Sequence, residues 1–430
     1  MYVYSIEADN FRGLPKFSLR LDKKLNVFIG NNGVGKTSML DLLTGMISQC
    51  RILSDELLLF KQSDVQNGKD DLSCRIACHL DKSNSFILAE YAMNVTSTNT
   101  KFFENKTGRF DDDSSSDLGP LHALYDELKE EGLPFTKNYP LVVSYPTNRA
   151  ILEIPERIRG FKPAVHPFDA MDSALSSYLD FRSFIALFRQ GEEMVAKRKP
   201  LIPDEYSEWL SRQVNAVNIA IHHVLPEFGE FHVQHKPFRI CIKKRDSEYE
   251  FLQLSDGEKC LIALLGDLAQ RLAIANPTLS NPLEGDAVVL IDELELHIHP
   301  IWQIRLIDSL QNIFPNAQFI ITTHSPLVLS NVHPENIWIM TEDGEQPSHP
   351  SRSYGMDTSE LLTEVMQAGS RNVEVSKELE RIDGLLIKED FDTAREAIRK
   401  LAEKTGNIPS IIGLNSELQM YGQEPVEIEG

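Results

Sequence analysis

The chain has 430 residues, of which 42% are hydrophobic and 25% are charged, and its formal net charge is −21 at pH 7. This composition is ordinary for a globular protein, and the length suits roughly two or three domains. An acidic surface repels nucleic acid, so the net charge of this chain excludes nucleic-acid binding through overall electrostatic attraction. Contact with DNA or RNA would need a local basic patch or a partner protein.

Membrane insertion and secretion are not expected. No stretch approaches the roughly 18 apolar residues that cross a bilayer, and the first residues lack a basic segment followed by an apolar one. The five cysteines show no disulfide spacing, which suits a reducing compartment. We therefore expect a cytoplasmic protein that makes no membrane contact.

Residues 1–95 are predicted to form the N-terminal part of an α/β head domain. Short alternating apolar runs predict strands near the start, and LNVFI (25–29) predicts a buried strand. That strand leads into GNNGVGKTS (30–38), which fits the P-loop pattern G-x-x-x-x-G-K-[ST], and then into SMLDLLT (38–44), which has helical spacing. The predicted nucleotide-binding residues are Gly30, Asn31, Asn32, Gly33, Val34, Gly35, Lys36, Thr37 and Ser38.

The chemistry predicted for this loop is the binding of ATP with Mg²⁺. Its glycines let backbone N–H groups point at phosphates, Lys36 supplies positive charge to the β- and γ-phosphates, and the Thr37 hydroxyl is a Mg²⁺ ligand. The helix that follows adds the positive end of its dipole. A purely structural glycine-rich turn is the alternative, which the strand before the loop and the helix after it disfavour.

Residues 96–237 are predicted to form a mainly helical insert. The strand-like LVVSY (141–145) lies inside it, and Asp111–Asp117 is acidic and serine-rich, which predicts a surface loop. No heptads are sustained over many turns, so a long coiled-coil arm is not expected.

Two patterns resemble binding sites but have simpler explanations. Cys74 and Cys78 lie in a strand-like run, without the second pair that would complete four metal ligands. The basic clusters at 197–199 and 243–245 are expected to be solvated faces.

Residues 238–345 are predicted to form the C-terminal part of the head. LSDGE (254–258) has the spacing of a capping box, in which Ser255 caps a helix and Glu258 lies three residues on. The functional alternative is that this helix N-terminus binds the γ-phosphate of an ATP held by another subunit, through Ser255, Gly257 and Glu258. The predicted strands are 238–242, 250–253, 287–292 and 317–323, and the predicted helices are 256–275 and 301–313.

Two of these strands end in candidate catalytic residues. AVVLIDE (287–293) predicts a buried strand with an acidic end, where Asp292 would bind the hydration shell of Mg²⁺ and Glu293 would polarise the attacking water. FIITTHS (319–325) brings His324 to the end of another strand, where it could sense the γ-phosphate. A structural histidine is the alternative.

Residues 346–430 are predicted to form a helical C-terminal region. Asp390 and Asp392 match the D-x-D pattern of a metal-dependent nuclease, but they precede a helical run, so an acidic helix cap explains them. No HNH arrangement occurs in the sequence. We expect no nuclease site within this chain.

The order of P-loop, LSDGE, Asp-Glu and histidine resembles the ABC-type ATPase heads of the RecF and SMC kind. The resemblance implies an α/β, ABC-type P-loop NTPase head with a mixed sheet and flanking helices, a helical insert and a helical C-terminal tail. In that family two heads enclose two ATPs, which implies a homodimer. It also implies a nucleotide contact for Arg12 in FRG (11–13), a metal-binding Q-loop glutamine at Gln62, and a D-loop at Ile298 and His299, where an aspartate is usual in place of the histidine.

Four stretches carry a narrower resemblance, to bacterial anti-phage ATPases of the Septu PtuA-type and retron-associated groups. Such ATPases form higher assemblies of head dimers and work beside a separate nuclease effector, often of HNH type, through which nucleic acid could be sensed. An ATP-dependent DNA clamp of the RecF or SMC kind is the alternative, and a transporter ATPase is a weaker third. The stretches are 266–277, 296–303, 314–326 and 354–357.

Overall fold

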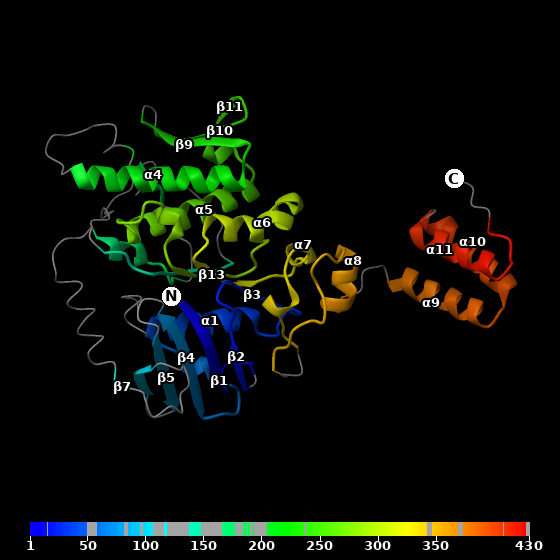
Figure 1. Ribbon diagram of the computed structural model, residues 1–430. Helices are drawn as coiled ribbons and strands as arrows, with labels where there is room; N and C mark the ends of the chain where they lie inside the picture. The colour runs from blue at the N-terminus through cyan, green and yellow to red at the C-terminus, as the bar shows by residue number, and fades with distance from the viewer. Residues whose placement is uncertain are drawn as a thin grey trace. The chain divides into compact units, whose positions relative to one another are not determined.

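The computed structural model (Figure 1) describes most of the chain. The predicted surface loop falls largely outside the described residues, as far as residue 115, and the basic cluster at 197–199 falls wholly outside them. The described residues are 1–14, 16–49, 58–80, 85–94, 98–105, 116–117, 137–147, 166–176, 184–186, 188–189, 192, 204–235, 238–341, 346–368, 373–406 and 408–426.

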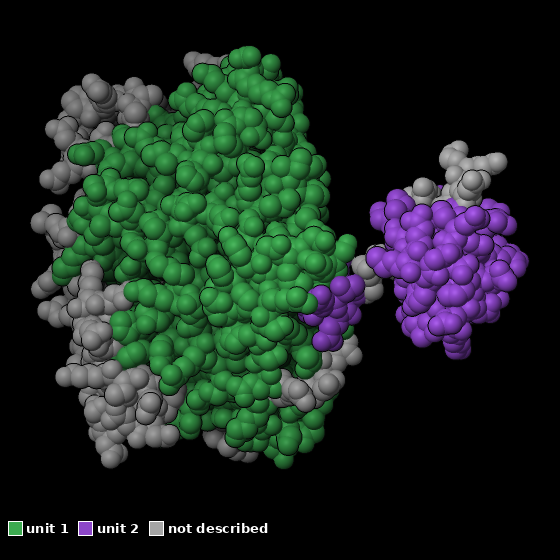
Figure 2. All heavy atoms as spheres, turned by 45° about the vertical axis from the view of Figure 1, so that its right-hand side comes forward, with its two compact units in different colours: residues 1–361 green, residues 362–430 purple. Residues whose placement is uncertain are grey.

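The chain divides into two compact units, Met1–Leu361 and Leu362–Gly430, which Figure 2 colours green and purple. The first unit contains every residue of the predicted nucleotide site. Within the described ranges, no helix is long and apolar enough to cross a membrane. The predicted domain boundaries inside the first unit stay predictions.

A five-stranded parallel sheet lies at the centre of the first unit, in the order β14-β3-β13-β12-β8. Both faces of a parallel sheet are covered, so its strands are mostly apolar, and every residue of β3, β12 and β13 is buried. The three predicted strands that carry site residues are therefore confirmed. The sheet consists of β3 (Leu25–Ile29), β8 (Leu141–Tyr145), β12 (Ala287–Ile291), β13 (Ala317–Thr322) and β14 (Ile337–Ile339).

A second sheet is antiparallel, in the order β2-β1-β4-β5-β6-β7. The side chain of Gln318 on β13 links it to the central sheet, because its amide donates to Val3 O at 2.8 Å and accepts from Val3 N at 2.7 Å. Cys74 and Cys78 are buried strand residues in β4, as predicted. The strands are β1 (Tyr2–Asp9), β2 (Phe17–Arg20), β4 (Asp71–Leu80), β5 (Ser85–Asn94), β6 (Thr98–Asn105) and β7 (Ser116–Asp117).

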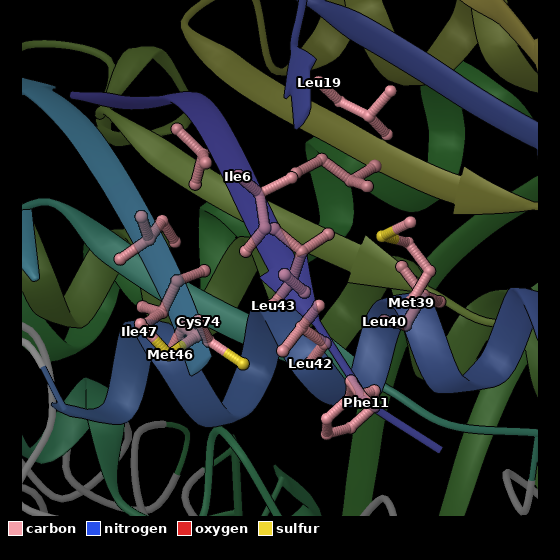
Figure 3. Close-up of a cluster of buried hydrophobic side chains, with 14 of the residues drawn as sticks. Ile6, Phe11, Leu19, Met39, Leu40, Leu42, Leu43, Met46, Ile47 and Cys74 are labelled. Atoms are coloured by element: carbon pink, nitrogen blue, oxygen red, sulfur yellow. The ribbon is translucent and has the colours of Figure 1, made fainter. Parts of the chain in front are cut away.

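Helix α1 (Lys36–Gln49) packs against both sheets, and this fixes the loop that precedes it. Figure 3 shows Leu43, Met46 and Ile47 of α1 beside Ile6 of β1 and Cys74 of β4. Burial of each large apolar side chain contributes about 1.5–3 kcal/mol. Other members of the same cluster are Met39, Leu40, Leu42, Ile76, Val288, Leu290 and Ile320.

Helices α5 and α4 lie on the other side of the central sheet from α1 (Figure 1). Helix α5 is buried along nearly its whole length and is mostly apolar, and its buried charges Asp267 and Arg271 pair with each other at 2.8 Å. Helix α6 follows β12 and begins after its N-cap, His299. The helices are α4 (Asp204–Val224), α5 (Asp256–Ala275) and α6 (Pro300–Ile313).

A three-stranded antiparallel sheet, in the order β11-β10-β9, follows α4 in the chain. The predicted strand at 250–253 is wrong in its position, because β11 ends at Glu250 and a 3₁₀ turn, η3 (Phe251–Gln253), follows. The turn buries Phe251 and leads the chain into the capping box. The strands are β9 (Phe228–His235), β10 (Phe238–Lys244) and β11 (Ser247–Glu250).

The range predicted as a helical insert contains both helices and strands where it is described. LVVSY forms β8, which lies beside β12 at one end of the central sheet as far as the chain is described. The short elements of the first unit are η1 (Gln62–Asp64), η2 (Pro167–Met171), η4 (Pro282–Glu284), α7 (Pro326–Leu329), η5 (Pro334–Asn336) and α8 (Thr358–Glu360), and a π-helical turn spans Leu361–Val365.

Residues Leu362–Gly430 form a small helical unit with its own hydrophobic core, so the predicted α/β head and helical C-terminal region are both confirmed. The Asp390 side chain accepts a hydrogen bond from Thr393 N at 3.4 Å and caps α10, which confirms the predicted cap. The helices are α9 (Val373–Ile387), α10 (Phe391–Thr405) and α11 (Pro409–Met420).

Candidate functional site

The loop between β3 and α1 has a backbone that requires glycine. Gly30 has φ +147° and Gly35 has φ +100°. A Cβ atom on Gly30 would collide with the carbonyl oxygen of Met340, and one on Gly35 would lie 2.5 Å from Leu14. Glycine at both positions therefore allows the loop to pass closely under these neighbours and into the helix.

Lys36 is a buried cation at the start of α1. Its side chain is 6% exposed, and its Nζ donates to the carbonyl oxygens of Gly30 and Asn31, at 2.8 Å each. Burial lowers the pKa of Lys36, and the nearby carboxylates of Asp292, Glu293 and Glu295 oppose that shift. The loop thus holds a positive charge next to three acids.

Asp292 joins the P-loop helix to two strands of the central sheet. Its Oδ2 accepts a hydrogen bond from Thr37 Oγ1 at 2.9 Å, and its Oδ1 accepts one from Thr322 Oγ1 at 2.5 Å. Its backbone N donates to Tyr145 O on β8 at 2.9 Å. Hydroxyl and carboxylate oxygens are ligands that Mg²⁺ prefers, so Thr37 and Asp292 together fit a magnesium site.

Glu293 has an unusual backbone conformation, with φ +47°. A non-glycine residue in the left-handed region costs of order 1–3 kcal/mol and persists only where its surroundings fix it. Here Glu293 N donates to Thr322 Oγ1 at 2.8 Å, and the next residue, Leu294, donates to Thr322 O at 3.0 Å. Thr322 therefore sets the direction in which the chain, and with it the Glu293 carboxylate, leaves β12.

His324 lies just after β13, on the same edge of the sheet as these acids. Its backbone N donates to Glu295 Oε1 at 2.6 Å, and Thr323 Oγ1 donates to Glu295 Oε2 at 2.7 Å. Burial lowers the pKa of His324, and the charge of Lys36 lowers it further, while the neighbouring carboxylates oppose both effects. The imidazole is therefore favoured in its neutral form.

The lowered pKa of His324 predicts a pH dependence of stability. His324 binds a proton less readily in the folded state than in the unfolded chain. Its contribution to stability is therefore fully present above its unfolded pKa and is lost as the pH falls through its folded pKa. Between about pH 7.5 and about pH 5.5, around the ordinary histidine pKa of about 6.5, the wild-type free energy of unfolding should fall more than that of His324→Gln. Urea unfolding of both proteins measures it, and parallel pH profiles would contradict it.

The capping box predicted at LSDGE is confirmed. Ser255 Oγ accepts from Glu258 N at 3.4 Å, and Glu258 Oε2 accepts from Ser255 N at 2.9 Å. Glu258 is buried and also pairs with Lys244, so its carboxylate already has partners within its own chain. Lys244, one of the basic cluster at 243–245, is therefore held in an ion pair. Ser255 itself is exposed.

Gly257 connects this helix N-terminus to the turn after Glu293. A Cβ atom on Gly257 would collide with the carbonyl oxygen of His297, which has φ +65°. Next to that carbonyl, Ile298 O accepts from Gln303 Nε2 at 2.7 Å, and Gln303 Oε1 accepts from Ser325 Oγ at 2.7 Å. The segments after β12 and β13 are thus tied to each other and to the start of α5.

His299, which stands where the resembled family has aspartate, has a local structural role. Its Nδ1 accepts a hydrogen bond from Ile301 N at 3.3 Å and caps α6. A side chain that accepts from the second residue of the helix satisfies the same cap as an aspartate would.

Arg12 lies close to the P-loop in the chain fold, because Leu14, two residues on, lies against Gly35, whereas Gln62 lies in η1. Arg12 has φ +48°, and its guanidinium binds Asp64 at 2.8 Å and Asp41 of α1 at 2.5 Å. Burial lowers the pKa of Arg12, but the hydrogen bonds to these two acids outweigh that effect and raise it. Gln62 is exposed in η1. The nucleotide contact of Arg12 and the metal role of Gln62 stay predictions.

Sequence reasoning missed Glu295 and Thr322, which hold His324 and Asp292. Glu295 is the next acid after Glu293 in DELEL, and this alternation could have pointed to it. Thr322 gave no signal, because a threonine at the end of an apolar strand is common and its partners come from another strand.

Comparisons with known proteins show which proteins this chain is similar to. Residues 25–330 match a family model described as "AAA domain, putative AbiEii toxin, Type IV TA system". The chain is 26% identical to "Retron Ec83 probable ATPase" of Escherichia coli, over 93% of this chain and 82% of that protein. It is 27% identical to "Retron Vc95 probable ATPase" of Vibrio cholerae serotype O1 biovar El Tor, over 83% of this chain and 77% of that protein.

A shorter match is to "Septu protein PtuA" of Bacillus mycoides (strain KBAB4), 36% identical over 26% of this chain and 16% of that protein. The resemblance to retron-associated and PtuA-type proteins is thus confirmed. Among solved structures, an SMC head bound to the C-winged helix domain of ScpA has a TM-score of 0.49 at 14% identity, covering 81% of this chain and 98% of that chain.

Proposed function

Because the chain belongs to the AAA domain family that its residues 25–330 match, we propose that it is the ATP-hydrolysing subunit of an anti-phage defence complex. One observation carries this proposal: Lys36, Thr37, Asp292 and Glu293 meet at one edge of the central sheet. The similarity to retron-associated ATPases over most of the chain supports the defence role.

Each residue at this edge has a proposed part in ATP hydrolysis. The backbone N–H groups of Gly30–Ser38 and the ammonium of Lys36 bind the phosphates. Thr37 and Asp292 hold Mg²⁺, which when bound neutralises charge on the phosphate oxygens. Glu293 orients the attacking water and accepts its proton, and His324 lies close enough to Lys36 and Glu293 to feel the charge of both.

We further propose that two heads meet around ATP, with the start of α5 facing the partner's nucleotide. Ser255 is exposed at this helix N-terminus, where backbone N–H groups and the dipole favour a phosphate. Two large apolar side chains are also exposed at the start of α6, beside the turn that contacts Gly257: Ile301 (66%) and Ile304 (40%). Apolar side chains next to this polar edge support an interface there.

Ser255→Arg should leave the head folded and greatly reduce ATP turnover, because the longer side chain fills the surface where the second head would approach. Loss of the helix cap alone costs about 0.5–2 kcal/mol. Ser255→Asn is the matched control, since asparagine caps helices as well as serine. Phosphate release is measured against protein concentration, with circular dichroism to verify folding.

If two heads must meet around ATP, the rate of ATP hydrolysis by the wild type depends on dimer formation. The specific rate should fall as the protein is diluted into the monomer range. Light scattering shows at which dilution only monomer remains. A specific rate that stays constant down to that dilution would contradict the proposal that two heads meet around ATP.

The chemistry on phage or host nucleic acid is proposed to lie in a separate nuclease effector, with HNH type the first expectation. The nucleotide state of this ATPase, in a homodimer or a larger assembly of dimers, would restrain or license that effector. The test is purification of the tagged chain from its native operon, followed by mass spectrometry. A stoichiometric nuclease supports the proposal, whereas a chain that comes alone and retains DNA would favour an ATP-dependent DNA clamp.

A further inference from the structure

One face of the three-stranded sheet brings three different metal-binding side chains together. His232 on β9 lies directly opposite Cys241 on β10, and Glu248 on β11 lies opposite Lys243, two residues from Cys241. Residues that are opposite in an antiparallel pair, or two apart in one strand, share a face. The three side chains therefore come from three adjacent strands and lie on the same side of the sheet.

The distances between their ligand atoms suit a single ion. One His232 ring nitrogen, Cys241 Sγ and one Glu248 oxygen all lie within 4.8 Å of one another. His232 Nε2 and Glu248 Oε1 are 3.1 Å apart. A tetrahedral Zn²⁺ with bonds of about 2.0–2.3 Å needs ligand atoms about 3.3–3.8 Å apart, so small side-chain rotations would complete the geometry.

The surroundings of these atoms favour an ion over a simple contact. His232 Nδ1 faces Glu230 O at 3.4 Å, which favours the tautomer that leaves Nε2 free to bind a metal. Cys241 is 3% exposed, while the His232 and Glu248 side chains are 26% and 54% exposed, so the cluster is open to solvent at His232 and Glu248 and buried at the thiol. An ion pair between His232 and Glu248 accounts for their contact but gives no role to the thiol beside them.

The charges around the thiol also favour a cation. Burial raises the pKa of the Cys241 thiol, the carboxylates of Glu248 and Glu250 raise it further, and the guanidinium of Arg239 lowers it. Two negative groups thus oppose one positive group at the sulfur atom. A bound divalent ion would add attraction to both acids and would hold the thiol as thiolate.

We propose that His232, Cys241 and Glu248 bind one Zn²⁺ ion, with water as the fourth ligand. Imidazole, thiolate and carboxylate are the donors that zinc takes in proteins, and three protein ligands with one open position is a known zinc arrangement. The ion joins the three strands that precede η3 and Ser255 in the chain. Lys244, at the end of β10, pairs with Glu258 of the capping box, so a rigid sheet would stabilise the start of α5.

The test is zinc binding by the full chain without nucleotide. Protein treated with chelator is dialysed, titrated with Zn²⁺ against a chromophoric chelator, and analysed for metal content. We expect one tight equivalent per chain in the wild type. Cys241→Ser and Glu248→Gln should each weaken zinc binding. The loss should exceed the roughly 10- to 100-fold that follows removal of a residue that only hydrogen-bonds to a metal ligand. Because Glu248 is exposed, its replacement leaves the fold intact.

Two controls separate this site from the proposed magnesium site and from general surface charge. Asp292→Asn and Asp246→Asn, the latter in the turn between β10 and β11, should both keep the zinc. Replacing Zn²⁺ by Co²⁺ should give a thiolate-to-cobalt charge-transfer band that Cys241→Ser lacks. Three outcomes would each overturn the proposal, whatever the ATPase activity. They are no tight zinc in the wild type, unchanged binding in Cys241→Ser and Glu248→Gln, and a cobalt spectrum without the thiolate band.

Discussion

Replacing Glu293 with glutamine should lower the rate of ATP hydrolysis by about 10²- to 10⁴-fold, the usual contribution of a positioned general base. The carboxamide has the same shape and keeps the backbone hydrogen bond from residue 293 to Thr322. It cannot take a proton from water at neutral pH, so ATP should stay bound and the proposed closed dimer should accumulate. Phosphate release, nucleotide affinity and light scattering in ATP measure the three effects separately.

The matched control is Glu284→Gln, which changes an exposed carboxylate in η4. Its hydrolysis rate should equal that of the wild type. A Glu293→Gln protein that hydrolyses ATP as fast as the wild type would show that another group activates the water. Weak ATP binding by that variant would instead assign Glu293 to the binding of nucleotide.

Replacing Lys36 with alanine should weaken ATP binding by about 100-fold or more, since hydrogen bonds from a charged donor contribute about 1.5–3 kcal/mol each. The wild-type ammonium is buried beside Asp292, Glu293 and Glu295. Without it, these acids would face the triphosphate with no counter-charge from the loop. Titration with a fluorescent ATP analogue measures the loss, and hydrolysis should disappear with it.

Lys61→Ala is the control for this substitution, because Lys61 is an exposed lysine that precedes η1. Thermal unfolding checks that Lys36→Ala is folded. If folded Lys36→Ala bound ATP with wild-type affinity, the loop would not be the phosphate site.

The sequence predicted those parts of the head that local patterns encode. The apolar runs of β3, β12 and β13, the P-loop glycines and the cap formed by Ser255 and Glu258 all depend on neighbours within a few residues. Their spacing also indicated that Lys36, Thr37, Asp292 and Glu293 belong to one site. Those four residues lie together because they follow β3 and β12, which are parallel and lie on either side of β13 in the central sheet.

The remaining features depend on partners that are distant in the chain. LVVSY could not be assigned to the central sheet, because only its pairing with β12 puts it there. The roles of Thr322 and Glu295 depend on hydrogen bonds between the ends of two strands. The three-strand cluster at His232 likewise required the register of β9, β10 and β11, which periodicity alone does not give.

The pairing of Gln318 with Val3 has a consequence for folding during synthesis on the ribosome. The two residues are 315 positions apart, and β3, which leads into the P-loop, lies next to β13. At about 5–20 residues per second, translation leaves the first strands without these neighbours for about 15 to 60 s. During that time apolar strands such as LNVFI are open to wrong pairing. We expect the nascent chain to depend on chaperones until its last third emerges.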